Sequence, residues 1–274
     1  MIPLLALVGC RFHFDELVDA NTAWTTPQPI EGANTAADEQ DPSMSAMQTE
    51  LYFTSNSGTQ LDLYVMTRPT SNAAWSSPQP LAFDTASNEQ SARLTSDDIT
   101  LYLASDRDGQ MYGDIYVVLR GALDQPWGAP VQLTQVNTTE LERWMSVCDD
   151  LHFVMVRAVL SMNMGEDLYQ GVLGGGTPTP IAELNTPGFD SGPFLTADCL
   201  TLYFASDRNN GQRDIFVSHR ASVDAAWDPP QPFAEFNDPV ALDEDPWMSR
   251  DGRTFVFASD RGGRQRDIYI STHL

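Results

Sequence analysis

The stretch Leu202-Tyr-Phe-Ala-Ser-Asp-Arg208, followed after a short gap by Asp214-Ile-Phe-Val217, decides the fold. Both segments are rich in β-branched and aromatic residues and are separated by residues typical of turns, so they predict two strands of a hairpin. The same pair recurs along the chain with a period of about fifty residues. The other copies begin at Leu51, Leu101, Leu151 and Phe255.

Each copy has two further segments that are typical of strands. An upstream segment opens with an acid, and a downstream segment contains aromatic residues and proline. The upstream segments begin at Glu39, Glu89, Glu140, Asp190 and Asp243. The downstream segments span 24–30, 75–81, 127–133, 178–181 and 227–233. One repeat therefore predicts four antiparallel strands, A to D, which is typical of a propeller blade.

The two ends of the chain complete each other in this scheme. The last copy stops soon after its C strand, at Leu274, whereas the chain begins with an unattached D strand at 24–30. If that strand completes the last blade, no sheet edge is left open to aggregation. We predict an all-β, five-bladed β-propeller formed by one domain over 23–274, with 1–22 as a separate segment.

Composition excludes some classes of function. The chain has 38 acidic and 15 basic residues, a net charge of −23, and all of its basic residues are arginine. Such a surface repels phosphate backbones, so we do not expect nucleic-acid binding. No apolar run reaches the roughly 18 residues that a transmembrane helix needs, so we expect no membrane span.

The first ten residues are apolar and end in Leu7-Val8-Gly9-Cys10. This ending resembles the lipobox of bacterial lipoproteins, in which the cysteine is acylated and becomes the mature N-terminus. A basic segment does not precede it, and the apolar stretch is short for a signal peptide. We expect an exported chain with a lipid anchor at Cys10. The alternative is a buried or frayed apolar terminus.

Ser-Asp-Arg, a Gly-rich turn, Asp-Ile-Tyr and Trp-x-x-Pro together resemble the TolB-type WD-like propeller repeat of bacterial envelope proteins. The resemblance covers 23–274 and is weak in copy three, where Met155-Val156 replaces the Ser-Asp pair. It implies a periplasmic, outer-membrane or secreted propeller that holds a protein or an envelope polymer. We expect a monomeric, non-enzymatic binding or scaffold module. The alternative is a carbohydrate-active hydrolase, since five-bladed propellers include glycoside hydrolases.

Acids at the start of strand A are the first candidate functional residues. The D-to-A and B-to-C loops of a propeller open on one face, so these acids are expected to lie near the arginines that end strand B. Structural acid–arginine pairs are predicted among Glu39, Glu89, Glu140, Asp190 and Asp243, and Arg107, Arg157, Arg208 and Arg261. The alternative is a ring of carboxylates that binds a cation or a basic partner. A second row on this face is predicted to contact the partner: Asp41, Glu142, Glu244 and Asp245.

The spacing of the histidines and acids along the sequence supports neither a metal centre nor a set of catalytic residues. The histidines are scattered along the chain at His13, His152, His219 and His273, and the acids repeat by register instead of varying between blades. Residues 106–109 faintly resemble a calcium loop, but they lack its ligand spacing. We therefore expect no cofactor, with calcium as the alternative.

Two cysteines remain, Cys148 and Cys199, at nearly equivalent A-to-B hairpin positions of adjacent blades. An even number in an exported chain permits one disulfide. Bridging also requires Cα atoms within about 7 Å of each other. The sequence leaves the bonded and the free state open.

Overall fold

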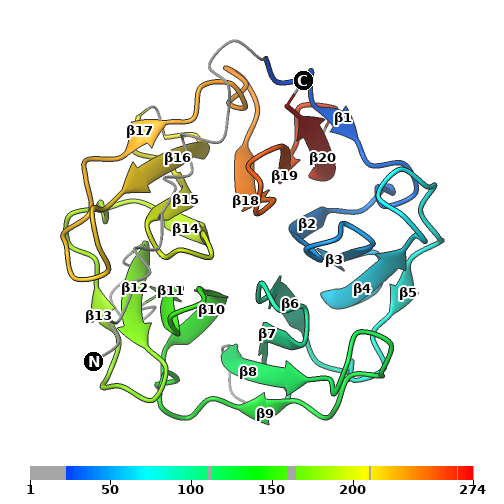
Figure 1. Ribbon diagram of the computed structural model, residues 1–274, viewed down its shortest axis with the longest axis horizontal. Helices are drawn as coiled ribbons and strands as arrows, with labels where there is room; N and C mark the ends of the chain where they lie inside the picture. The colour runs from blue at the N-terminus through cyan, green and yellow to red at the C-terminus, as the bar shows by residue number, and fades with distance from the viewer. Residues whose placement is uncertain (1–22, 110–112, 159–164, 210, 264, 274) are drawn as a thin grey trace, which may run out of the picture.

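The computed structural model describes residues 23–109, 113–158, 165–209, 211–263 and 265–273. Five four-stranded antiparallel sheets surround a central channel, as Figure 1 shows. None of the described residues is helical, and none lies in a helix that could span a membrane. The predicted five-bladed, all-β propeller is confirmed.

Each blade runs from an inner strand A beside the channel to a short outer strand D. The A strands are β2 (Glu39–Met44), β6 (Glu89–Leu94), β10 (Leu141–Val147), β14 (Asp190–Leu195) and β18 (Asp243–Met248). The B strands are β3 (Glu50–Ser55), β7 (Thr100–Ser105), β11 (His152–Ala158), β15 (Thr201–Ser206) and β19 (Thr254–Ser259). The C strands are β4 (Asp62–Thr67), β8 (Asp114–Leu119), β12 (Glu166–Val172), β16 (Asp214–His219) and β20 (Asp267–Thr272). The D strands are β1 (Gln28–Pro29), β5 (Gln79–Pro80), β9 (Val131–Gln132), β13 (Thr179–Pro180) and β17 (Gln231–Pro232).

The fifth blade is closed by the N-terminal strand, as the sequence predicts. Its strand order is β1-β20-β19-β18, and Gln28 lies opposite Ile270. The main-chain N–H groups of Thr25 and Ile30 donate to the carbonyl oxygens of Thr272 and Ile268, each at 2.9 Å. A strand from the beginning of the chain therefore covers the outer edge of the sheet built from its end.

Strand A carries a bulge in every blade, at its third residue in four blades and at its fourth residue, Trp144, in β10. These residues have positive φ although only one of them is glycine: Asp41 (58°), Ser91 (60°), Trp144 (53°), Gly192 (56°) and Asp245 (55°). A register shift in the A–B pairing occurs at the same place in each sheet. Such bulges redirect a side chain and free a backbone N–H. Here the freed groups link neighbouring blades, because Ser91 N–H donates to Asp41 Oδ2 at 3.0 Å and Asp41 N–H to Asp245 Oδ2 at 3.2 Å.

We call the side with the D-to-A and B-to-C loops the loop face, and the side with the A-to-B turns and C-to-D connections the hairpin face. On the hairpin face, an arginine after strand C covers the tryptophan before strand D. These pairs are Arg68–Trp75, Arg120–Trp127 and Arg220–Trp227, with guanidinium-to-ring distances of 4.0 to 4.5 Å. Blade three has glycines at 174–176 instead of such a pair, which leaves space at its outer edge.

Candidate functional site

The predicted acid–arginine pairs are present in blades two, four and five. Arg107 lies 3.2 Å from Glu89, Arg208 lies 2.7 Å from Asp190, and Arg261 lies 2.6 Å from Asp243, and all three acids are buried. The acids also accept hydrogen bonds from main-chain N–H groups of their own D-to-A loops. These pairs fix the loop face of each blade.

Blade one has no arginine at this position. Glu39 is buried, and it accepts hydrogen bonds from the N–H and hydroxyl of Thr35 and from the hydroxyl of Ser55. Burial raises its pKa, and the nearby Asp267 acts in the same direction. Hydroxyl and amide donors therefore take over the role that the guanidinium has in the other blades.

Blade three corrects the sequence prediction, because Arg157 pairs with Glu142 and not with Glu140. Arg157 Nε lies 2.7 Å from Glu142 Oε1, and Glu142 is buried. In the A–B pairing of blade three Glu142 lies opposite Arg157, and in blade two Glu89 lies opposite Ser105. Relative to the alignment of the repeats in the sequence, copy three is therefore displaced by two residues in strands A and B. A threonine four residues before the acid is the signal that could have given the register: Thr35, Thr85, Thr138 and Thr186.

The four acids predicted to contact a partner are buried. Their exposed fractions are 0% for Asp41 and Glu142, 3% for Glu244 and 2% for Asp245. Glu244 lies 2.6 Å from Arg213 and 2.9 Å from Arg266. Asp41 accepts hydrogen bonds from the Thr54 hydroxyl at 2.7 Å and from the Trp144 indole. The structure thus gives these acids partners within the protein, and their contact with another molecule stays a prediction.

Buried arginines balance the charge of the channel. Arg93 donates to the carbonyl oxygen of Pro42 at 2.5 Å, and burial lowers its pKa while Asp245 and Asp41 oppose that shift. Arg143 contacts Glu166, and burial lowers the pKa of Arg143 to about 10. Burial also raises the pKa of Asp245, with contributions from Asp41 and Glu244. Acids and arginines of the channel therefore lie near one another, although Arg93 Nε and Nη2 and Arg143 Nε make no hydrogen bond among the described residues.

The carboxylates of the calcium-like segment also have protein partners. Both oxygens of Asp106 accept hydrogen bonds from Asn88, and Asp108 accepts one from the Tyr116 hydroxyl at 2.5 Å. These contacts fix the B-to-C loop of blade two against its neighbours. Calcium binding here stays a prediction.

The hairpin-face mouth of the channel is partly apolar, although Asp98 and Arg250 also line it. A pocket with an empty volume of about 530 Å³ is lined there by the last residue of each A strand. Those residues are Met44, Leu94, Val147, Leu195 and Met248. The side chains of Phe194 and Trp247 also line it, 6.2 Å apart between ring centroids, and hydroxyls such as Thr95 and Ser249 contribute polar groups. This pocket could accept an apolar group of a partner.

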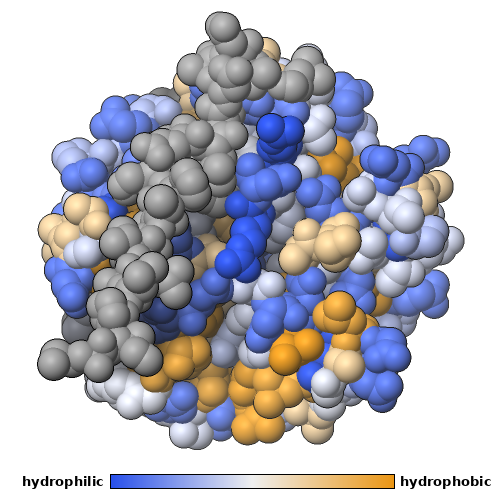
Figure 2. Space-filling model, in the orientation of Figure 1, coloured by the Kyte–Doolittle hydropathy of each residue, from blue (hydrophilic) through white to orange (hydrophobic). Residues whose placement is uncertain are grey.

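The turns around this pocket carry exposed acids. Four of the A-to-B turns contribute them: Asp97, Asp149, Asp150, Asp198 and Asp251. Exposed apolar side chains lie on the same face, including Met47 (69% exposed) and Leu151 (54%) in two of these turns. Figure 2 shows hydrophobic surface gathered in the lower part of the view, around β8, β9 and β10. The hairpin face thus combines apolar groups with negative charge.

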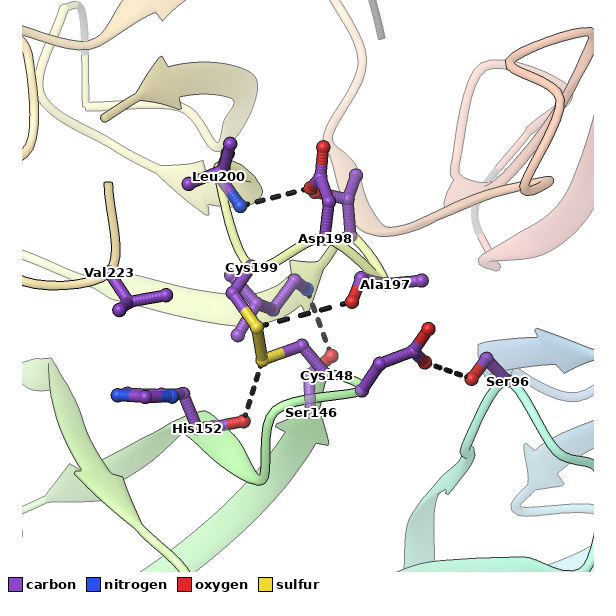
Figure 3. The surroundings of a disulfide bond; sticks show 12 residues. Ser96, Ser146, Cys148, His152, Ala197, Asp198, Cys199, Leu200 and Val223 are labelled. Carbon is purple, nitrogen blue, oxygen red and sulfur yellow. Dashed lines mark hydrogen bonds between the residues drawn. A yellow bond between two sulfur atoms is a disulfide. The ribbon is translucent and has the colours of Figure 1, made fainter. Parts of the chain in front are cut away.

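The turns of blades three and four are joined by a disulfide between Cys148 and Cys199, with Cα atoms 5.4 Å apart. This finding decides between the two states that the sequence leaves open. Figure 3 shows the bond with the carbonyl oxygen of His152 beside the Cys148 sulfur. The bond links two consecutive blades at the rim of the apolar pocket.

Comparison with known proteins supports the fold. A putative TolB from Agrobacterium tumefaciens is 17% identical, with 87% of this chain and 77% of that chain covered and a TM-score of 0.55. A GH62 α-L-arabinofuranosidase catalytic domain from Coprinopsis cinerea is 11% identical, with 92% and 97% covered and a TM-score of 0.61. An endo-arabinase from Bacteroides thetaiotaomicron is 12% identical, with 91% and 97% covered and a TM-score of 0.60. No family model and no curated protein sequence matches the chain. At these identities the likeness shows the propeller fold alone.

The corrected register of blade three makes a testable prediction. Glu142→Gln is expected to lower the free energy of unfolding by about 1 kcal/mol, because charge-assisted hydrogen bonds are roughly twice as strong as neutral ones. Glu140→Gln, the matched control two residues away, is expected to change it by less than half as much. Urea unfolding of both variants measures the difference. A larger loss of unfolding free energy in Glu140→Gln than in Glu142→Gln would favour the pairing of Glu140 with Arg157 that the sequence predicts.

Proposed function

We propose that this protein is a non-catalytic binding propeller whose hairpin-face pocket receives an apolar side chain of a protein partner. The observation that carries the proposal is the contrast between the two ends of the channel. At the loop-face end the acids are buried and paired with arginines, hydroxyls and N–H groups. At the hairpin face an apolar pocket of about 530 Å³ opens to the surface.

The partner segment is expected to carry basic residues next to its apolar side chain. Exposed acids stand on the turns around the pocket, and the chain as a whole has a net charge of −23. The one arginine in the pocket lining, Arg250, lies 3.2 Å from Asp149 and is partly neutralised by it. Complementary charge speeds encounter and selects partners, and salt screens it over about 8–10 Å.

The setting that fits this role is the bacterial cell envelope. The lipobox-like ending at Cys10 lies outside the described residues and supports export with a lipid anchor, as does the resemblance of the repeats to TolB-type propellers. The disulfide between Cys148 and Cys199 fits an oxidising compartment. We propose a monomer that is tethered at its N-terminus and holds its partner at the envelope.

Selection of a displayed random peptide library on the immobilised protein tests the proposal. We expect enriched peptides to have an apolar residue flanked by Lys or Arg and to bind more weakly as salt rises. Val147→Glu, in the pocket, is expected to weaken the selected peptides about tenfold or more, because a carboxylate would enter an apolar site. Val131→Glu on the exposed outer strand β9 is the control. Peptides that bind both variants equally would contradict the pocket as the site.

The second candidate function, a carbohydrate-active hydrolase, is supported by the solved arabinofuranosidase and arabinase structures among the similar propellers. Glycoside hydrolysis uses two carboxyl groups that flank the bond to be cleaved. Asp41 and Asp245 do meet in the channel, but the groups they contact are protein atoms. Release of p-nitrophenol from an α-L-arabinofuranoside, abolished in Asp41→Asn at unchanged melting temperature, would favour the hydrolase over the binding module.

A further inference from the structure

Three side chains with metal-binding chemistry meet at the junction of blades three and four. The sulfurs of Cys148 and Cys199 and a ring nitrogen of His152 all lie within 4.8 Å of one another. His152 begins β11 and lies four residues after Cys148, whereas Cys199 comes from the next blade. Figure 3 shows the disulfide between the two turns, with His152 beside it and the His152 carbonyl oxygen directed at the Cys148 sulfur.

Hydrogen bonds hold the two turns together independently of the disulfide. The N–H of Asp149 donates to the carbonyl oxygen of Ala197 at 3.0 Å, and the N–H of Leu195 donates to the Ser146 hydroxyl at 2.9 Å. Within the blade-three turn, Cys148 N–H donates to the carbonyl oxygen of His152 at 3.0 Å. If the sulfur–sulfur bond is broken, these contacts keep both thiols and the imidazole in place.

The imidazole of His152 is available as a ligand. Its Nδ1 atom is buried and makes no hydrogen bond within the described part of the chain. A buried imidazole nitrogen without a partner is an unfavourable arrangement in a folded protein, and coordination of a cation would satisfy it.

The site can be reached from the surface on two sides. His152 lines a pocket with an empty volume of about 690 Å³, together with Glu183 and Asp224, at the outer edge where blade three lacks the arginine–tryptophan pair. Cys148 lines a second pocket of about 760 Å³, beside Asp97 and Asp149. One arginine lines each pocket as well, Arg220 in the first and Arg250 in the second, so two acids face one arginine on each approach and leave it negative in sum.

We propose that reduction of the Cys148–Cys199 disulfide converts this junction into a binding site for a thiophilic closed-shell ion, Zn²⁺ or Cu⁺, with Cys148, Cys199 and His152 as ligands. A dithiol supplies two electrons and two protons, so that the disulfide becomes two thiols and the dithiol becomes a disulfide. Binding of the ion then releases the two thiol protons. Thiolates select Cu⁺ and Zn²⁺ over harder ions, and three protein ligands leave a fourth position for water on zinc.

Metal titration of the full chain in both redox states tests the proposal. The protein is reduced with dithiothreitol, freed of it under argon, and titrated with Zn²⁺ or Cu⁺ against a chromophoric chelator. We expect one equivalent of tightly held ion in the reduced protein and none in the oxidised protein. The ion that competes successfully with its chelator decides between zinc and copper. Equal binding in the two redox states, or no binding in either, would overturn the proposal.

Variants separate the three-ligand site from simple capture by a dithiol. His152→Ala is expected to weaken the bound ion about tenfold or more, and the double substitution Cys148→Ser with Cys199→Ser to abolish binding. His219→Ala is the matched control, because that imidazole contacts Thr201 on another part of the sheet. If the affinity for the ion is unchanged in His152→Ala, His152 is not a ligand and the proposal is contradicted.

Stability measurements exclude unfolding as the cause of any change in binding. The double serine variant is expected to keep a cooperative melting transition, because the inter-blade hydrogen bonds remain. The reduced protein is expected to melt at a higher temperature with the ion than without it, since a ligand that binds only the native state stabilises it. A reduced protein that is unfolded both with and without the ion would contradict the proposal.

Discussion

Deletion of residues 1–33 will lower the free energy of unfolding by about 5 kcal/mol or more, or will leave the protein insoluble. This segment carries Trp24, whose ring packs edge-on against Phe236 at 5.0 Å, and Ile30, which is buried beside β20. It also supplies β1, the outer strand of the fifth blade. Loss of one buried and one partly buried large side chain alone costs several kcal/mol, a large part of the stability of an ordinary domain.

The control for this truncation is deletion of residues 1–22 alone. Among the described residues, the strand contacts that close the fifth blade belong to Trp24, Gln28 and Pro29, so we expect the shorter deletion to leave the melting temperature nearly unchanged. Soluble yield, size-exclusion elution and thermal melting compare the two proteins. If the longer deletion melts like the full chain, the closing strand does not stabilise the ring. The full-length variant Trp24→Ala provides a milder test.

Replacement of Asp84 by asparagine will stabilise the protein at neutral and alkaline pH. In each of the other four D-to-A loops the side-chain amide of an asparagine makes two hydrogen bonds to one residue of strand C. Its oxygen accepts from the main-chain N–H of that residue, and its nitrogen donates to the C=O. Asn137, for example, binds the N–H and C=O of Ile115 at 2.8 and 3.0 Å. By the repeat, Asp84 faces Leu63, and an ionised carboxylate cannot donate the second bond.

Protonation explains how the protein tolerates this acid. Both carboxylate oxygens of Asp84 are buried without a hydrogen-bond partner among the described residues. Burial, followed by the charges of Glu89 and Asp62, raises the pKa of Asp84 to about 7, and the nearby main-chain N–H groups of Leu81 and Leu63 oppose that shift. Since the folded-state pKa lies above the value of the unfolded chain, the proton stabilises the fold fully below about pH 4, and this contribution is lost as the pH rises through about 7.

The advantage of Asp84→Asn is therefore expected to grow from near zero at pH 4 to about 2 kcal/mol at pH 8. The reverse change, Asn137→Asp, is the matched control and should bring the same pH dependence to the next blade. Urea unfolding of the three proteins from pH 4 to pH 8 measures both effects. A difference between Asp84→Asn and the natural chain that does not vary with pH would contradict a buried, titrating Asp84.

The sequence predicted the strands correctly in four of the blades but not the register of blade three. The copies at Leu101, Leu202 and Phe255 share Ser-Asp-Arg, which fixes their alignment, whereas copy three has Met155-Val156 in its place. A displacement by two residues keeps every side chain on the same face of a strand, because the pleat has a period of two. Hydrophobic pattern therefore cannot distinguish Glu140 from Glu142. The pairing with Arg157 does so, and along the chain the signal is Thr138, four residues before Glu142.

The burial of the channel acids could also not be predicted from the sequence. Asp41 and Asp245 lie at bulged positions with positive φ, and such a bulge turns a residue that would otherwise continue the strand toward its neighbour in the next blade. Charges from another blade also take part: Arg213 of blade four binds Glu244 of blade five. An acid that looks exposed by its place near a loop becomes buried when charges from distant repeats surround it.

The sequence by itself determined the number of blades, the four strand types and the closure of the ring, because each depends on local patterns that repeat about every fifty residues. Only the tertiary structure showed which side chains meet where the sequences of the repeats differ. Cys148 and Cys199 are separated by 51 residues, and they meet because consecutive blades place equivalent turns side by side. His152 joins them because its hairpin folds back on Cys148. Contacts of this kind depend on distances between blades, which a pattern read along one strand does not contain.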